Sequence, residues 1–129
     1  MKTASLLLIT INVASMCDLQ VQVYSDVDYT VWTQFTFANK TKGKMQEIRD
    51  SGANQTRYTH ISSANCEEGP TVLKGYRRDP SGRIVFYGET SAYLDGDGFV
   101  DYTFFDITGP RMGLRTGVTC GFGDCGIRG

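Results

Sequence analysis

The sequence predicts a small all-β protein, folded as a single antiparallel β-sandwich of seven or eight short strands. The chain has 129 residues, the size of one domain, and 40% of them are hydrophobic, which is enough to form a core. It is rich in glycine, with 15 residues, and in threonine, tyrosine, phenylalanine and valine, the composition of strands and turns. Segments of alternating hydrophobic and polar residues recur along the chain at spacings of about 8–12 residues.

The first two strands are predicted from alternation with a period of two residues. Leu19, Val21 and Val23 alternate with polar residues, as in a strand with one buried face. Residues 29–37 alternate in the same way and place Trp32 among polar neighbours on one face. The opposite face, which we expect to enter the core, carries Tyr29, Val31, Phe35 and Phe37.

The next stretch contains turns and one further strand. Residues 38–44 and 50–54 are rich in turn-forming residues, and the segment between them, 45–49, is short enough to be either a strand or a helical turn. Residues 56–62 alternate again and predict a strand.

A β-hairpin is predicted in the middle of the chain. Two strands, residues 71–77 and 83–87, flank the loop 78–82, which contains Pro80 and Gly82. Proline presets the backbone for a turn, and glycine supplies the unusual φ angle that such a loop needs.

Two more strands are predicted before a glycine-rich end. Residues 91–94 lead into an acidic turn at 95–98, followed by the strand 99–105. Residues 112–120 alternate strictly, and we expect the glycine-rich tail 121–129 to be held only by its cysteine. The face of that alternating strand that we expect to be buried carries Met112, Leu114, Thr116, Val118 and Cys120.

This succession of strands and turns predicts a β-sandwich or a small barrel, of which we favour two packed antiparallel sheets. An immunoglobulin-like arrangement, or a similar one, is an analogy of architecture only. The tryptophan that lies between bridged cysteines in immunoglobulin domains has no counterpart, since Trp32 precedes Cys66 and the later cysteines.

The N-terminal segment, residues 1–17, predicts a cleaved secretory signal peptide. Lys2 precedes a hydrophobic run over residues 4–14, which is about the length of a signal-peptide core and too short to span a bilayer. No later run approaches the length of a membrane span, so we expect a secreted, extracellular protein. A buried N-terminal strand is the alternative interpretation.

Two cleavage positions fit the small residues at the end of this segment. Cleavage after Ser15 or after Cys17 is compatible with the pattern, so the mature chain is predicted to start between Met16 and Asp18. The folded domain is then expected over residues 18–120.

The four cysteines predict disulfides but not their pairing. Cys17 lies at the possible cleavage point, and if it is retained three connectivities are possible. We expect Cys66 to bridge Cys120 or Cys125, because closing so long a loop stabilises by about 4 kcal/mol, more than a short loop between the last two cysteines. A zinc site would need His60 as its fourth ligand and lacks paired short spacings.

Two sequons predict N-linked glycosylation, at Asn39 and at Asn54. Both lie in polar, turn-like stretches that fit a secreted surface. Beside the first one, Lys40, Lys42 and Lys44 offer either a small site for an anionic group or simply a solvated turn.

The most specific local motif is acidic and resembles part of an EF-hand calcium loop. Asp95, Asp97 and Asp101 fall at alternating positions that suit oxygen ligands for calcium. The positions of the first and last ligands hold Tyr93 and Phe104, which cannot coordinate calcium, and the flanks predict strands. Two interpretations of this segment remain, a calcium site with a less regular set of ligands and an acidic turn that binds no metal. No other cofactor is expected.

Enzymatic function is not predicted. His60 is the single histidine, so a small secreted hydrolase would have to use it, but no nucleophile motif accompanies it. With a net charge of -1 and no strongly basic run, nucleic-acid binding is not expected either.

The function predicted from these features is binding. We expect a non-enzymatic protein that acts through a β-sandwich surface on an extracellular protein or glycan, with a calcium-dependent module and a hydrolase as alternatives. Trp32 is the binding residue we name, because its predicted face is polar and tryptophan is enriched among residues that dominate interfaces.

Overall fold

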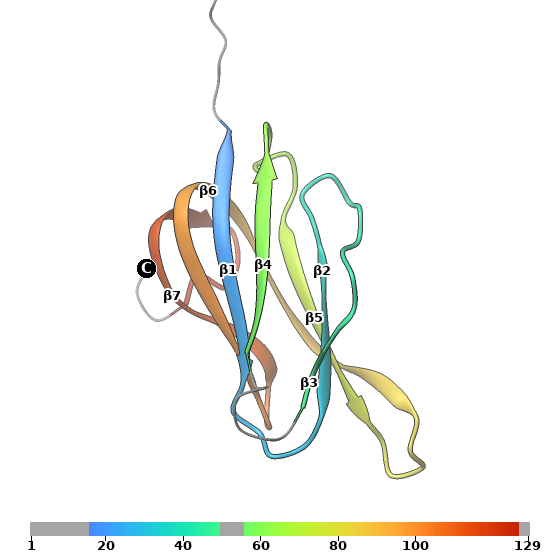
Figure 1. Ribbon diagram of the computed structural model, residues 1–129. Coiled ribbons are helices and arrows are strands. Elements are labelled where there is room, and N and C mark those ends of the chain that lie inside the picture. Colours follow the sequence, from blue (N-terminus) through green and yellow to red (C-terminus); the bar gives the residue numbers. More distant parts are fainter. Residues whose placement is uncertain (1–15, 50–55, 127–129) are drawn as a thin grey trace, which may run out of the picture.

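The computed structural model describes residues 16–49 and 56–126, and it contains strands but no helix in these ranges (Figure 1). All the strands are predicted from the sequence at least in part, and the ambiguous segment 45–49 contains a strand. The strands are β1 (Cys17–Ser25), β2 (Val31–Thr36), β3 (Gln46–Ile48), β4 (Thr56–Ser63), β5 (Thr71–Arg78), β6 (Ile84–Phe105) and β7 (Gly109–Gly121).

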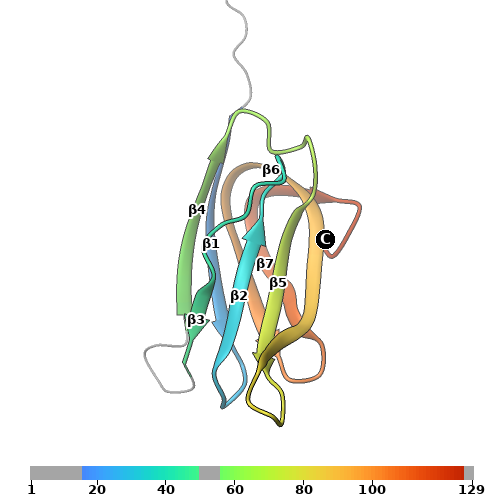
Figure 2. The same ribbon diagram turned by 90° about the vertical axis from the view of Figure 1, so that its right-hand side faces the viewer.

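The seven strands form one sheet, in the order β3-β2-β5-β6-β1-β4, with β7 paired to β6. Pairing is antiparallel except between β1 and β6. At the two ends of the path, the Thr59 hydroxyl on β4 donates a hydrogen bond to Gln46 beside it on β3, at 3.4 Å. The strands therefore curve around one interior into a nearly closed barrel, as two perpendicular views show (Figures 1 and 2). The all-β prediction is confirmed, whereas the two-sheet sandwich is not.

The longest strand, β6, belongs to both halves of this barrel. Its first part, residues 84–92, pairs with β5, and its second part pairs with β1 and β7. The acidic segment 95–98, predicted as a hairpin turn, lies inside this strand, so that prediction is wrong. The glycines there form a β-bulge against β7 instead of reversing the chain, and Gly96 has the positive φ of 114°.

The core is built from inward-facing side chains of all seven strands. Leu19, Val21 and Val23 are buried, as their alternation predicts, and so are Val31 and Phe35 on β2. Among the described residues, the fully buried side chains include Cys17, Leu19, Val23, Val31, Thr33, Ile48, Leu73, Leu94, Val100, Phe104 and Pro110.

The strict alternation predicted for β7 is interrupted. Met112 and Val118 are buried as expected, but Leu114 is 55% exposed. Between the pairs Tyr102↔Met112 and Val100↔Arg115, β7 advances three residues while β6 advances two. The extra residue in β7 places Leu114 on the outer face of the sheet. Alternation in the sequence alone cannot reveal such a shift.

Two disulfides are present, and their pairing differs from the predicted one. Cys17 bridges Cys66, with their Cα atoms 6.1 Å apart, and Cys120 bridges Cys125, at 5.7 Å. The predicted bridge from Cys66 to the C-terminal pair is therefore wrong. Loop-length energetics favoured it, but Cys17 is the first residue of β1 and lies in the core, within reach of Cys66.

The C-terminal segment is held by more than its cysteine. The Asp124 carboxylate accepts hydrogen bonds from the Thr90 hydroxyl at 2.6 Å and from the amides of Met112 and Gly126. Burial by itself raises the pKa of Asp124, but these hydrogen bonds outweigh it and lower that pKa below its ordinary value. The described part of the predicted loose tail is thus attached to β6 and β7.

The predicted hairpin between β5 and β6 is confirmed, and it projects from the lower right of the molecule (Figure 1). The Asp79 carboxylate accepts hydrogen bonds from the amides of Ser81 and Arg83, and Gly82 has a φ of 93°. This tight loop sets the register of the two strands.

Candidate functional site

Three aromatic side chains lie in one row across the outer face of the barrel. Trp32 on β2 pairs in register with Tyr76 on β5, and Tyr76 pairs with Phe86 on β6. Because residues opposite one another in a sheet lie on the same face, the three residues form a continuous aromatic surface. We refer to Trp32, Tyr76 and Phe86 as the aromatic row.

Contacts within the row fix its side chains. The rings of Tyr76 and Phe86 meet edge to face, with centroids 6.0 Å apart and planes at 77°. The Arg78 guanidinium lies over the Trp32 ring, 5.1 Å from its centroid. Beside them Ile84, opposite Arg78, is 46% exposed.

The row is accessible at its β6 end. Phe86 is 54% exposed, and Trp32 is half-buried. Trp32 therefore lies on the outer face, as its polar neighbours predict, but only part of its side chain is exposed to solvent. Its partners Tyr76 and Phe86 were missed, because only the strand register brings three segments so distant in sequence together.

Charged and polar residues border the aromatic row. On one side of the row, Lys74 on β5 lies between Gln34 on β2 and Glu89 on β6, each opposite it in register. Glu47 on β3 pairs in register with Trp32 at the row's end. A hydrophobic centre with a polar rim is the usual composition of a protein-binding surface.

His60, the residue on which a hydrolase would depend, lies elsewhere, on β4. Its Nε2 contacts the Asp18 carboxylate on β1, and both side chains are about half exposed. In the described ranges no serine, threonine or cysteine is hydrogen-bonded to this imidazole. His60 also lines two surface clefts, and its hydrogen-bonded partner, Asp18, is a carboxylate rather than a nucleophile.

The three aspartates of the calcium hypothesis do not come together. Asp101 accepts a hydrogen bond from the Leu114 amide at 2.9 Å, and Asp95 interacts with Glu67. Asp97 is exposed on β6. Within residues 16–49 and 56–126, no group of three or more histidine, cysteine, aspartate or glutamate side chains is arranged to hold a metal ion.

The first sequon is on the surface, whereas the second falls outside the described residues at Asn54. Asn39 is exposed in the loop after β2, where its side-chain oxygen accepts hydrogen bonds from the amide and hydroxyl of Thr41. Lys40, Lys42 and Lys44 are exposed in the same tight loop.

Comparison with models of protein families, with curated proteins and with solved structures finds no match to this chain. Over the described ranges we also find no helix with the length and hydrophobicity of a membrane span.

Proposed function

We propose that this chain is a secreted, non-enzymatic binding protein that contacts an extracellular protein through the aromatic row. The observation that supports this most directly is the in-register placement of Trp32, Tyr76 and Phe86 on one outer face. Tryptophan, tyrosine and arginine are the residues that most often dominate the energy of protein interfaces, and Arg78 stacks on this row.

The geometry of the row favours a protein partner over a glycan. Sugar rings stack on flat aromatic faces, but the planes of Tyr76 and Phe86 are at 77° and offer no common platform. The exposed Ile84 adds aliphatic surface, which suits the packed centre of a protein interface. A glycan partner is therefore an outcome to be tested.

Secretion is supported by the predicted signal peptide and by two disulfides, which form in oxidising compartments. Because Cys17 is bridged to Cys66, we expect cleavage after Ser15, the earlier of the two predicted positions. N-terminal sequencing of secreted material should begin at Met16. A chain that starts at Asp18 would contradict this expectation and would also exclude the Cys17 bridge from the mature protein.

Substitutions in the aromatic row should weaken partner binding. We expect W32A to cost about 2 kcal/mol or more of affinity, a factor of about 30, and F86A about tenfold. Because Trp32 is half-buried and stacks with Arg78, W32A should also lower stability by about 1 kcal/mol, whereas the exposed Phe86 provides a variant with little structural effect.

The measurement has two stages. Proteins captured from extracellular fluid by the wild type and by each variant are identified by mass spectrometry, and the purified partner is then titrated calorimetrically. The control is Y58A, which removes a 71% exposed aromatic residue on β4 outside the row. Equal affinity of wild type, W32A and F86A for the captured partner would refute the proposal. It would also be refuted if the wild type bound only glycans on an array and the variants lost that glycan binding.

A further inference from the structure

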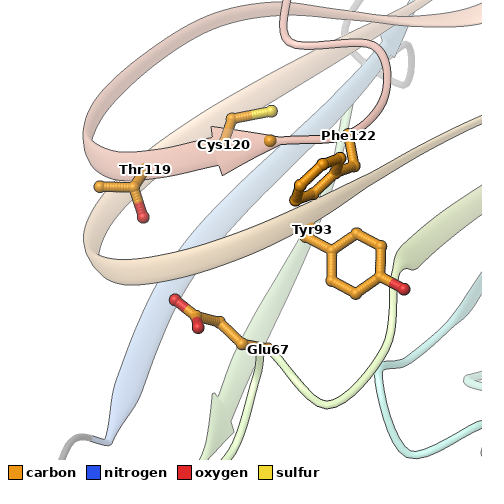
Figure 3. Close-up of a pocket in the computed structure, with 6 residues that line it drawn as sticks. Glu67, Tyr93, Thr119, Cys120 and Phe122 are labelled. Carbon is orange, nitrogen blue, oxygen red and sulfur yellow. The ribbon is translucent and has the colours of Figure 1, made fainter.

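A second surface feature, separate from the aromatic row, is an open cleft of about 730 Å³. Figure 3 shows its side chains, which come from three segments: the loop after β4, strand β6, and the end of β7 with the residues after it. This volume lies within the range of small-molecule sites. The lining residues are Glu67, Tyr93, Thr119, Cys120, Gly121 and Phe122.

Two aromatic rings form one wall of the cleft. Tyr93 and Phe122 meet edge to face, with centroids 5.8 Å apart and planes at 80°. Tyr93 is 37% exposed and Phe122 is 91% exposed, so the ring faces remain accessible. Such faces carry negative electrostatic potential and attract cations.

A carboxyl group lies on the opposite side. Glu67 reaches into the cleft from the loop after β4, and Asp95 of β6 interacts with it (Figure 3 shows Glu67). The hydrogen bond with Asp95, together with its negative charge, raises the pKa of Glu67 above its ordinary value. The two groups repel each other when both are ionised, and a bound cation would relieve that repulsion.

Among the described residues, none that lines the cleft is basic, so none of them neutralises the Glu67 carboxylate. The hydroxyls of Thr119 and Tyr93 are the other polar side-chain groups of the lining. Aromatic faces and a carboxylate complement the same ligand, a positively charged group that also donates hydrogen bonds.

From this complementarity we propose that the cleft bounded by Glu67, Tyr93 and Phe122 binds a small organic amine in its ammonium form. The ammonium group lies against the aromatic rings and donates hydrogen bonds to the Glu67 carboxylate, while the rest of the molecule occupies the open volume. The site shares no residue with the aromatic row, so it is a function additional to protein binding.

Spermidine is the probe for the test, titrated into the isotopically labelled full chain and followed by nuclear magnetic resonance. We expect chemical-shift changes at the amides of Tyr93, Thr119, Gly121 and Phe122. The variants E67Q and F122A should each weaken spermidine binding at least tenfold. Both replaced side chains lie on the surface, and a well-dispersed spectrum of each variant establishes that it is folded.

Two matched controls separate a specific site from general attraction to negative charge. E68Q removes the same charge from the adjacent exposed residue, and F99A removes a 62% exposed ring of β6 that does not line the cleft. Both should bind spermidine within twofold of the wild type. The proposal is overturned if the cleft amides do not shift at millimolar spermidine, or if E68Q weakens binding as much as E67Q. It is equally overturned if calcium chloride or a trisaccharide binds the cleft more tightly than spermidine.

Discussion

Replacing Cys17 and Cys66 together by alanine is expected to lower the free energy of unfolding by about 4 kcal/mol. The bridge joins residues separated by 49 positions, so removing it restores a large conformational freedom to the unfolded chain. Total stabilities of single domains are about 5–15 kcal/mol, so the double variant should be marginally stable. Urea denaturation at equilibrium measures the difference.

The second bridge provides the internal comparison. Cys120 and Cys125 are separated by only 5 positions, and the same chain-entropy argument gives about 2 kcal/mol for their removal. We therefore expect the Cys17/Cys66 variant to unfold at clearly lower urea concentration than the Cys120/Cys125 variant. The reverse order would show that the short bridge stabilises the native structure by something other than loop closure.

Gly98→Ala is the second change for which we expect a large effect, about 3 kcal/mol of destabilisation. A Cβ atom at Gly98 would be only 1.8 Å from the backbone oxygen of Thr116 on β7. A backbone atom cannot move aside as a flexible side chain can, so the bulge between β6 and β7 would have to open. Thermal unfolding followed by circular dichroism measures the loss.

The matched control for this change is Gly121→Ala at the end of β7. A Cβ atom there would meet nothing within 4 Å, so this variant should melt close to the wild-type temperature. Similar melting temperatures for Gly98→Ala and Gly121→Ala would mean that the bulge is readily rearranged, contrary to our expectation.

The strands that the sequence predicts best are those whose geometry is regular. In β1 and β2, alternation alone identifies Leu19, Val21 and Val31 as core residues, since every side chain obeys the period of a strand. It fails where bulges intervene. The Asp-Gly repeat at 95–98 has the composition of a turn, and its pairing with β7 and with β1 makes it part of a continuous strand.

The candidate sites also differ in whether neighbouring residues in the sequence suffice to predict them. Trp32 could be assigned to an outer face from its immediate neighbours, which is local information. Its partners Tyr76 and Phe86, and the meeting of Glu67 with Phe122 at the cleft, depend on contacts between distant segments. The disulfide pairing failed for the same reason, because sequence separation is not distance in the folded chain.

Strand β6 has a consequence for how this protein folds and opens. Because its first part pairs with β5 and its second with β1 and β7, neither half of the barrel has a complete set of strands without it. Its parallel pairing with β1 joins residues such as Asp18 and Asp97, roughly 80 positions apart, and contacts of such separation make folding slow. We therefore expect the molecule to unfold as one cooperative unit. β1 can pair with β4 early, but its pairing with β6 must wait until most of the chain has been made.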